Sequence, residues 1–246
     1  MTVKIITPYV FEDEIKEHQN LFWELDVHYE RDTALVGSDM MFQKLWKKFP
    51  KDDIFILHAD MTPHHSGWFD EVLGYVKLYP EAGMFGCLLL YPARNNKNEF
   101  YIQCAGGQFT DQGPDHFGSG LLLENKSKFK KDLEIDRGQY DKVREVAWTT
   151  FGGCYIRRSF IDKVGDFSAK YEWTYNRDVD YCLRGRELGE CIYQIPVRLF
   201  HHESKDNKRV KNDSNIKMEM RNLERLKAKW GNSKFYKTLD KEIKLG

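Results

Sequence analysis

The sequence predicts an α/β domain with a mostly parallel central sheet that is flanked by helices. Short apolar runs of strand length alternate with amphipathic stretches of helical length over the first 90 residues. The chain of 246 residues is long enough to bury one good core. Its 41% hydrophobic and 31% charged residues are typical of a soluble globular protein and exclude a disordered or fibrous chain.

The elements of the first half follow one another in regular alternation. We expect strands at 3–9, 27–31, 53–57 and 83–90, and helices at 12–25, 38–49 and 68–79. Apolar residues at helical spacing define the helices, and the second helix begins at a capping Ser38 or Asp39 and stops before Pro50. The strand at 53–57 is the strongest in the sequence and runs directly into Asp60. Ligands of such sheets bind at the carboxyl ends of the strands.

The second half is less regular. Glycine-rich turns divide residues 92–147, where we expect a smaller part of antiparallel strands and loops. We expect a turn into a strand at 148–158, a helix at 178–188, a strand at 192–200 and an amphipathic basic helix from 212, with Ile216, Met220, Leu223 and Trp230 on one face. No linker interrupts the chain, so residues 1–211 form one domain on which the extension 212–246 packs.

The charge and the cysteine content limit which partners and which cellular compartment the sequence favours. The net charge of zero does not indicate a nucleic-acid binder. Residues 203–246 nevertheless carry a net charge of +6. This basic segment could face anionic phosphates, an anionic membrane surface or simply solvent. Five scattered cysteines without a CxxC pair favour a reducing compartment. Because no signal peptide or membrane span is visible, we expect a cytoplasmic protein, with peripheral contact of the tail at the inner face of the membrane as an additional expectation.

Residues able to do chemistry stand at the ends of the predicted elements. They are Asp60, the pair Asp178 and Asp180, and the pair His201 and His202. Each signal alone is weak, because an aspartate after a strand is more often a turn former, Asp178 suits a helix start, and paired histidines are commonly surface residues. Their combination around one α/β sheet is what indicates a site.

Several segments in this order resemble glycosyltransferase family 2, the nucleotide-sugar-dependent enzymes of the GT-A fold, over roughly residues 3–204. The similar segments are Ile5-Ile6-Thr7-Pro8-Tyr9, Ile56–Pro63 with Gly67-Trp68-Phe69, Ile102–Gly107, Gly152–Phe167, Arg177-Asp178-Val179-Asp180 through Gly189, and Phe200-His201-His202-Glu203-Ser204. The sequence departs from the pattern at His58, where the first aspartate of a DxD motif would stand, and at Arg177, where many members have glutamate or asparagine.

The resemblance implies an inverting transfer of a sugar from a nucleotide-diphosphate sugar of UDP, GDP or dTDP type to a hydroxyl of a glycan or lipid-linked glycan, in O-antigen or capsule synthesis. It implies that Asp60 and His201 hold Mn²⁺ or Mg²⁺ and that Asp178 is the general base. The donor-binding candidates are Thr7, Pro8, Tyr9, Asp32, His58, Lys208 and Arg209. The acceptor-binding candidates are Trp148, Trp173, Asp180 and His116, although core packing is the more common function of such tryptophans.

Two other functions stay open. A nucleotidyltransferase that makes the sugar donor would carry a glycine-rich basic loop after the first strand, whereas Tyr9 is followed by Val10-Phe11-Glu12-Asp13. A catalytically silent binder of nucleotide sugars or glycans is compatible with the irregular His58 and Arg177. An active transferase slowly hydrolyses its donor and a silent binder does not, so donor hydrolysis separates the two.

Overall fold

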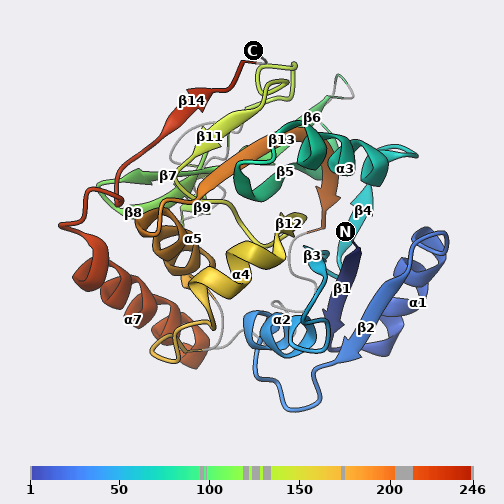
Figure 1. The fold of residues 1–246 in the computed structure, drawn as a ribbon, viewed down its shortest axis with the longest axis horizontal. Helices are drawn as coiled ribbons and strands as arrows, with labels where there is room; N and C mark the ends of the chain where they lie inside the picture. The colour runs from blue at the N-terminus through green and yellow to red at the C-terminus, as the bar shows by residue number, and fades with distance from the viewer. Residues whose placement is uncertain are drawn as a thin grey trace.

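The computed structural model describes residues 2–94, 97, 99–118, 122–123, 128–129, 134–172, 175–202 and 213–244. Within these residues one ten-stranded sheet lies at the centre, with its main path in the order β14-β11-β13-β5-β12-β3-β1-β2 (Figure 1). Its strands are β1 (Val3–Tyr9), β2 (Val27–Arg31), β3 (Asp53–Ile56), β4 (Met61–Pro63), β5 (Ala82–Arg94), β6 (Phe100–Cys104), β11 (Arg144–Val146), β12 (Cys154–Ile156), β13 (Cys191–His201) and β14 (Asp240–Glu242). Two small antiparallel pairs, β7 (Gly107–Thr110) with β8 (Gly113–His116) and β9 (Leu122–Leu123) with β10 (Lys128–Phe129), lie beside it.

The predicted parallel framework is confirmed. Strand β1 lies between β2 and β3 and is parallel to both, with Ile5 opposite Val27 on one side and Phe55 on the other. Strand β12 is antiparallel to both β3 and β5, and β13 is parallel to β5. Strands β2, β1, β3, β5 and β13 therefore all point the same way, and their carboxyl ends meet at one edge of the sheet.

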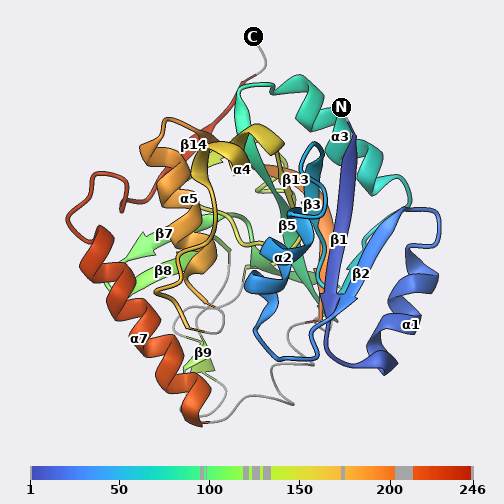
Figure 2. The same ribbon diagram turned by 60° about the horizontal axis from the view of Figure 1, so that its bottom comes forward.

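Helices cover both faces of the sheet (Figure 2). On one face, α2 (Ser38–Trp46), α4 (Arg158–Val164), α5 (Arg177–Glu187) and α7 (Asp213–Trp230) bury a core that contains Trp46, Phe160, Tyr181 and Trp230. On the other face, α1 (Glu12–Leu21) and α3 (Trp68–Leu78) bury a second core that contains Phe22, Phe55 and Trp68. Burial of large apolar side chains on both faces is what such a sheet requires.

Several elements differ from the sequence expectation. Helix α1 ends at Leu21, because Phe22 turns inward against Trp68 and the chain then turns into β2. Strands β4 and β14 and helix α4 are additional elements. Helix α7 begins at Asp213, close to the expected 212, and ends at Trp230. Its buried face carries Asn222, Leu226 and Trp230, whereas Met220 is 61% exposed. Asn222 lies inside because its side chain bonds the backbone of Glu172 in both directions, at 2.7 and 2.9 Å.

Two further features of the structure concern its cysteines and the character of its helices. All five cysteines are free. Among the described helices, none has the length and the apolar character needed to cross a bilayer.

Candidate metal centre

Strand β4 brings Asp60 and His201 together. The carboxyl ends of β3 and β13 are separated in the sheet by β12 and β5. The chain after β3 folds back as β4, which pairs antiparallel with the end of β13 so that Met61 lies opposite His201. The His202 backbone N–H then donates to the Asp60 carbonyl at 2.9 Å. This pairing places the side chains of Asp60 and His201 next to each other.

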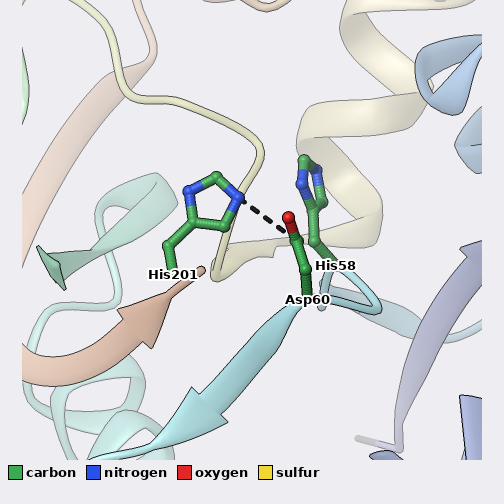
Figure 3. A group of neighbouring side chains, drawn as sticks. All are labelled: His58, Asp60 and His201. Atoms are coloured by element: carbon green, nitrogen blue, oxygen red, sulfur yellow. Dashed lines mark ion pairs between the residues drawn. The ribbon is translucent and has the colours of Figure 1, made fainter. Parts of the chain in front are cut away.

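A third side chain, His58, joins them from the same loop (Figure 3). One ligand atom from each of His58, Asp60 and His201 lies within 4.8 Å of the other two. His201 Nε2 is 3.3 Å from Asp60 Oδ1. The rings of His58 and His201 meet edge to face at 5.6 Å, and Phe42 stacks on His58 at 5.3 Å. Two imidazoles and one carboxylate that converge at these distances can hold a divalent cation.

The hydrogen bonds of the cluster favour a positive charge at its centre. Gln103 Oε1 lies 2.7 Å from His201 Nδ1, so this ring nitrogen donates to the amide oxygen. In the neutral ring, Nε2 then carries a lone pair that faces the Asp60 carboxylate, and two acceptors in contact repel each other. The buried His58 Nε2 has no hydrogen-bond partner among the described residues. Burial lowers the pKa of His58 to about 4, and the neighbouring His201 acts in the same direction, so His58 is neutral near pH 7. The donor set therefore fits a divalent cation.

Asp178 lies in the first turn of α5, as expected, and its surroundings perturb its carboxyl strongly. Burial raises its pKa to about 6, although the backbone N–H groups of Val179 and of Asp178 itself lower it. The Val179 N–H donates to Asp178 Oδ1 at 2.8 Å. The Asp178 charge also helps to raise the pKa of the Cys104 thiol, although burial of the thiol has the larger effect.

Arg177, where the sequence departs from the family pattern, is buried beside Asp178. Its Nη2 donates to the Tyr171 carbonyl, while Nε and Nη1 find no hydrogen-bond partner within the part of the chain that the structure describes. Burial lowers its pKa, and Asp39 opposes this effect. The residue brings a positive charge to the start of α5, but its contacts assign it no ligand.

The donor-side candidates lie at the carboxyl ends of β1 and β2. Thr7 is fully buried in β1, and among the described residues its hydroxyl has no hydrogen-bond partner. Pro8 follows it, and the Tyr9 hydroxyl contacts Glu12 at 3.4 Å. The Asp32 carboxylate accepts the N–H groups of Val36 and Gly37 at 3.1 and 2.9 Å. These bonds shape the loop before α2, so donor contact by Asp32 stays a prediction.

The acceptor-side candidates are mostly internal. Trp148 is 3% exposed, donates its indole N–H to the Gln108 carbonyl and packs its ring at a tilt against His116, 4.9 Å between ring centroids, which are the contacts of a core residue. Burial lowers the pKa of His116 to about 4, with a smaller contribution from His201 in the same direction. Asp180 is 1% exposed and faces α7. Trp173, Lys208 and Arg209 lie outside the described residues.

Sequence reasoning did not assign a function to Gln103. It lies in the segment Ile102–Gly107 that carries part of the family resemblance, and that is the one signal that pointed to it. Its partner His201 is 98 residues away, so the contact follows only from the fold.

Comparisons with known proteins place the fold. The sequence matches no protein-family model, and no curated protein matches it. In structure the chain is similar to GalNAc-T7, solved with UDP, GalNAc and Mn²⁺, with a TM-score of 0.56 and 12% identity over 91% of this chain and 48% of that one. It is also similar to the mannosyltransferase PcManGT from Pyrobaculum calidifontis, solved with GDP-Man and Mn²⁺, with a TM-score of 0.52 and 11% identity over 83% and 57%.

These likenesses show the fold, which is the GT-A-type architecture expected from the sequence. The chain spans about half the length of the two glycosyltransferases. Fold alone does not carry activity from one protein to another, so the function has to be argued from the site.

Proposed function

We propose that the protein is a glycosyltransferase that moves a sugar from a nucleotide-diphosphate sugar to a hydroxyl of a glycan acceptor, with inversion at the anomeric carbon. The observation that carries this proposal is the convergence of His58, Asp60 and His201 at the carboxyl-end edge of the sheet. Two proteins of the same fold were solved with Mn²⁺ and with UDP or GDP-mannose. A cation site at the ligand-binding edge of this architecture suits a diphosphate donor.

Asp60, His201 and His58 would hold the cation. A divalent cation held there would supply positive charge against the negative charge that develops on the diphosphate leaving group as the glycosidic bond breaks. The donor set favours Mn²⁺ over Mg²⁺, because Mg²⁺ prefers oxygen ligands whereas imidazole suits later transition metals. His58, first expected on the donor side, becomes a third ligand in this proposal.

Asp178 would take the proton of the acceptor hydroxyl. A hydroxyl is a weak nucleophile near neutral pH, and a general base contributes roughly 10²–10⁴-fold when its pKa lies near the working pH. The pKa of about 6 for Asp178 satisfies this condition. Attack from the face opposite the leaving diphosphate inverts the configuration. Donor contacts by Thr7–Tyr9 and an acceptor contact by His116 belong to the same proposal.

The proposed biological setting is surface-polysaccharide synthesis in the cytoplasm. The free cysteines suit a reducing cytoplasm, and surface-polysaccharide synthesis follows from the family resemblance of the sequence.

Donor hydrolysis and transfer test the function. We expect the protein with Mn²⁺ to hydrolyse one of a panel of UDP-, GDP- and dTDP-sugars slowly, and to transfer that sugar faster when an acceptor is added. Asp178→Asn should lose transfer by roughly 10²–10⁴-fold while it retains donor binding, because the amide cannot accept the proton. Asp162→Asn, an exposed carboxylate paired with Arg158 on α4, is the matched control and should behave as wild type.

Two results would contradict the proposal. Binding of a nucleotide sugar without any hydrolysis or transfer would indicate a silent binder. Full turnover by Asp178→Asn would remove this residue from the position of the base.

A further inference from the structure

The loop between β3 and β4 carries two of the three candidate ligands, and long-range hydrogen bonds fix its backbone at both ends. At one end the Asp60 carbonyl accepts the His202 N–H at 2.9 Å. At the other end the His58 carbonyl accepts the Met61 N–H at 3.1 Å, and His18 Nε2 lies 3.1 Å from the same oxygen. Both lone pairs of the His58 carbonyl are therefore used.

His18 reaches this carbonyl from helix α1, 40 residues away in the chain. Its side chain is buried, with its ring 4.4 Å from the ring of Phe22. A carbonyl can only accept, so Nε2 carries the proton. On the other side of the ring, Nδ1 lies 2.9 Å from the Tyr29 hydroxyl. Tyr29 therefore fixes the orientation of the ring whose Nε2 holds the His58 carbonyl.

We propose that His18, oriented by Tyr29, is a positioning residue that holds the His58 peptide so that His58 and Asp60 face His201, and that it thereby sets the affinity of the site for a divalent cation. The inference rests on the cation site of the proposed function. The His58 carbonyl carbon and the Cβ that carries the imidazole are attached to the same Cα, so the bond that anchors this carbonyl also restrains the Cα from which the imidazole reaches His201. Residues that orient metal ligands in this way typically contribute 10–100-fold to metal affinity.

Three substitutions isolate the hydrogen bond from the packing. His18→Phe keeps an aromatic ring beside Phe22 but removes the donor. His18→Gln returns an amide N–H near the position of Nε2. Tyr29→Phe removes only the hydroxyl that orients His18. The matched control is Tyr193→Phe in the amino-terminal half of β13. It removes the 2.8 Å hydrogen bond that the Tyr193 hydroxyl donates to Glu81.

The readout is the dissociation constant for Mn²⁺ alone, measured by electron paramagnetic resonance of the free ion, together with the melting temperature in EDTA. We expect His18→Phe to weaken Mn²⁺ binding by about 10–100-fold. His18→Gln should restore most of the affinity, Tyr29→Phe should weaken binding by a smaller factor, and Tyr193→Phe should bind as wild type. The melting temperature in EDTA shows separately how much each change costs the fold.

Wild-type Mn²⁺ affinity in a folded His18→Phe protein would overturn the inference, whatever its melting temperature. If His18→Phe does not fold, Tyr29→Phe decides in the same way, and unchanged affinity there overturns it. A wild-type protein that does not bind Mn²⁺ would instead overturn the cation site of the proposed function. The two failures are thus told apart by the wild-type titration.

Discussion

At the scale of the residue, Asp178 is a buried carboxyl whose ionisation lowers the stability of the folded protein. Its carboxyl stands in the first turn of α5, where backbone N–H groups and the helix dipole favour the ionised form. Burial outweighs them and raises the pKa to about 6. A carboxyl whose pKa is raised by folding favours the folded state at low pH, and this contribution is lost as the pH rises through the folded pKa. The ionised Asp178 therefore destabilises the fold at neutral pH, as expected for a group retained for function.

Asp178→Asn should accordingly stabilise the protein in a pH-dependent way. At pH 8 we expect a gain of up to about 3 kcal/mol in the free energy of unfolding, since the pKa rises by about two units from 3.8 and each unit is worth about 1.4 kcal/mol. The gain should be largely absent at pH 4, where the carboxyl of the folded protein is already neutral. Urea unfolding at the two pH values measures the difference. An equal change at pH 4 and pH 8 would show that burial does not raise the pKa of Asp178.

Some residues of the proposed site can be predicted from the sequence and others cannot. Asp60, Asp178 and His201 stand directly at the ends of strong elements and in segments with a family resemblance, so they were accessible from the sequence. Gln103 and His18 were not, because the first meets His201 across 98 residues and the second meets the His58 carbonyl across 40. Neither residue type nor spacing marks such partners. They follow only from the way the strands and helices pack.

At the scale of the element, Asp180 joins α5 to α7. Its Oδ1 accepts from Trp230 Nε1 at 2.8 Å, from Lys229 Nζ at 2.7 Å and from the Tyr171 hydroxyl at 3.2 Å. Its Oδ2 accepts from Arg184 Nε at 3.1 Å. A carboxylate so fully bonded inside the protein holds helix α7 in place, whereas the sequence predicts that Asp180 binds the acceptor.

Asp180→Asn separates these two functions. Because the indole and tyrosine donors are buried against the carboxylate, we expect a loss on the order of 2–3 kcal/mol in the free energy of unfolding. The KM for the acceptor should stay unchanged at a temperature where the variant is folded. Asp166→Asn, an exposed carboxylate paired with Lys47, should change stability by less than about 0.5 kcal/mol. A raised acceptor KM with unchanged stability would favour an acceptor-binding Asp180 instead.

The elements themselves were largely predictable where the local pattern is strong. The alternation of strands and helices from β1 to β5 follows from apolar periodicity, and so does the helix that begins at Arg177. Strand β4 could not be predicted, because its three residues become a strand only by pairing with the end of β13, about 140 residues further along the chain. The reversed direction of β12 between β3 and β5 is likewise a property of the assembled sheet.

At the scale of the whole molecule, the candidate cation site joins residues that lie about 140 positions apart in the sequence. His58 and Asp60 follow β3 in the amino-terminal half, and His201 ends β13 near the carboxyl terminus. The sheet between them separates two large apolar cores. A cation that is held by both parts binds only the assembled fold, so its binding energy adds to the free energy of unfolding.

Mn²⁺ should therefore raise the melting temperature of the protein. At a free concentration 100 times its Kd, a ligand of the folded state adds about 2.7 kcal/mol. For a chain of 246 residues this corresponds to a shift of about 5–10 °C. Scanning calorimetry in EDTA and in Mn²⁺ measures the shift, and a matching nucleoside diphosphate added with Mn²⁺ should raise it further. Mg²⁺ should give a smaller shift, since two of the three ligands are imidazoles.

Substitutions locate the ion that produces this shift. Asp60→Ala and His201→Ala should each abolish most of it, because the remaining two side chains hold the cation weakly. His65→Ala is the matched control, since this partly exposed histidine pairs with Glu71 at 3.2 Å and is not one of the three converging residues. A full Mn²⁺ shift in Asp60→Ala would place the bound ion elsewhere, and the convergence of β3, β4 and β13 on a cation would then lose its experimental support.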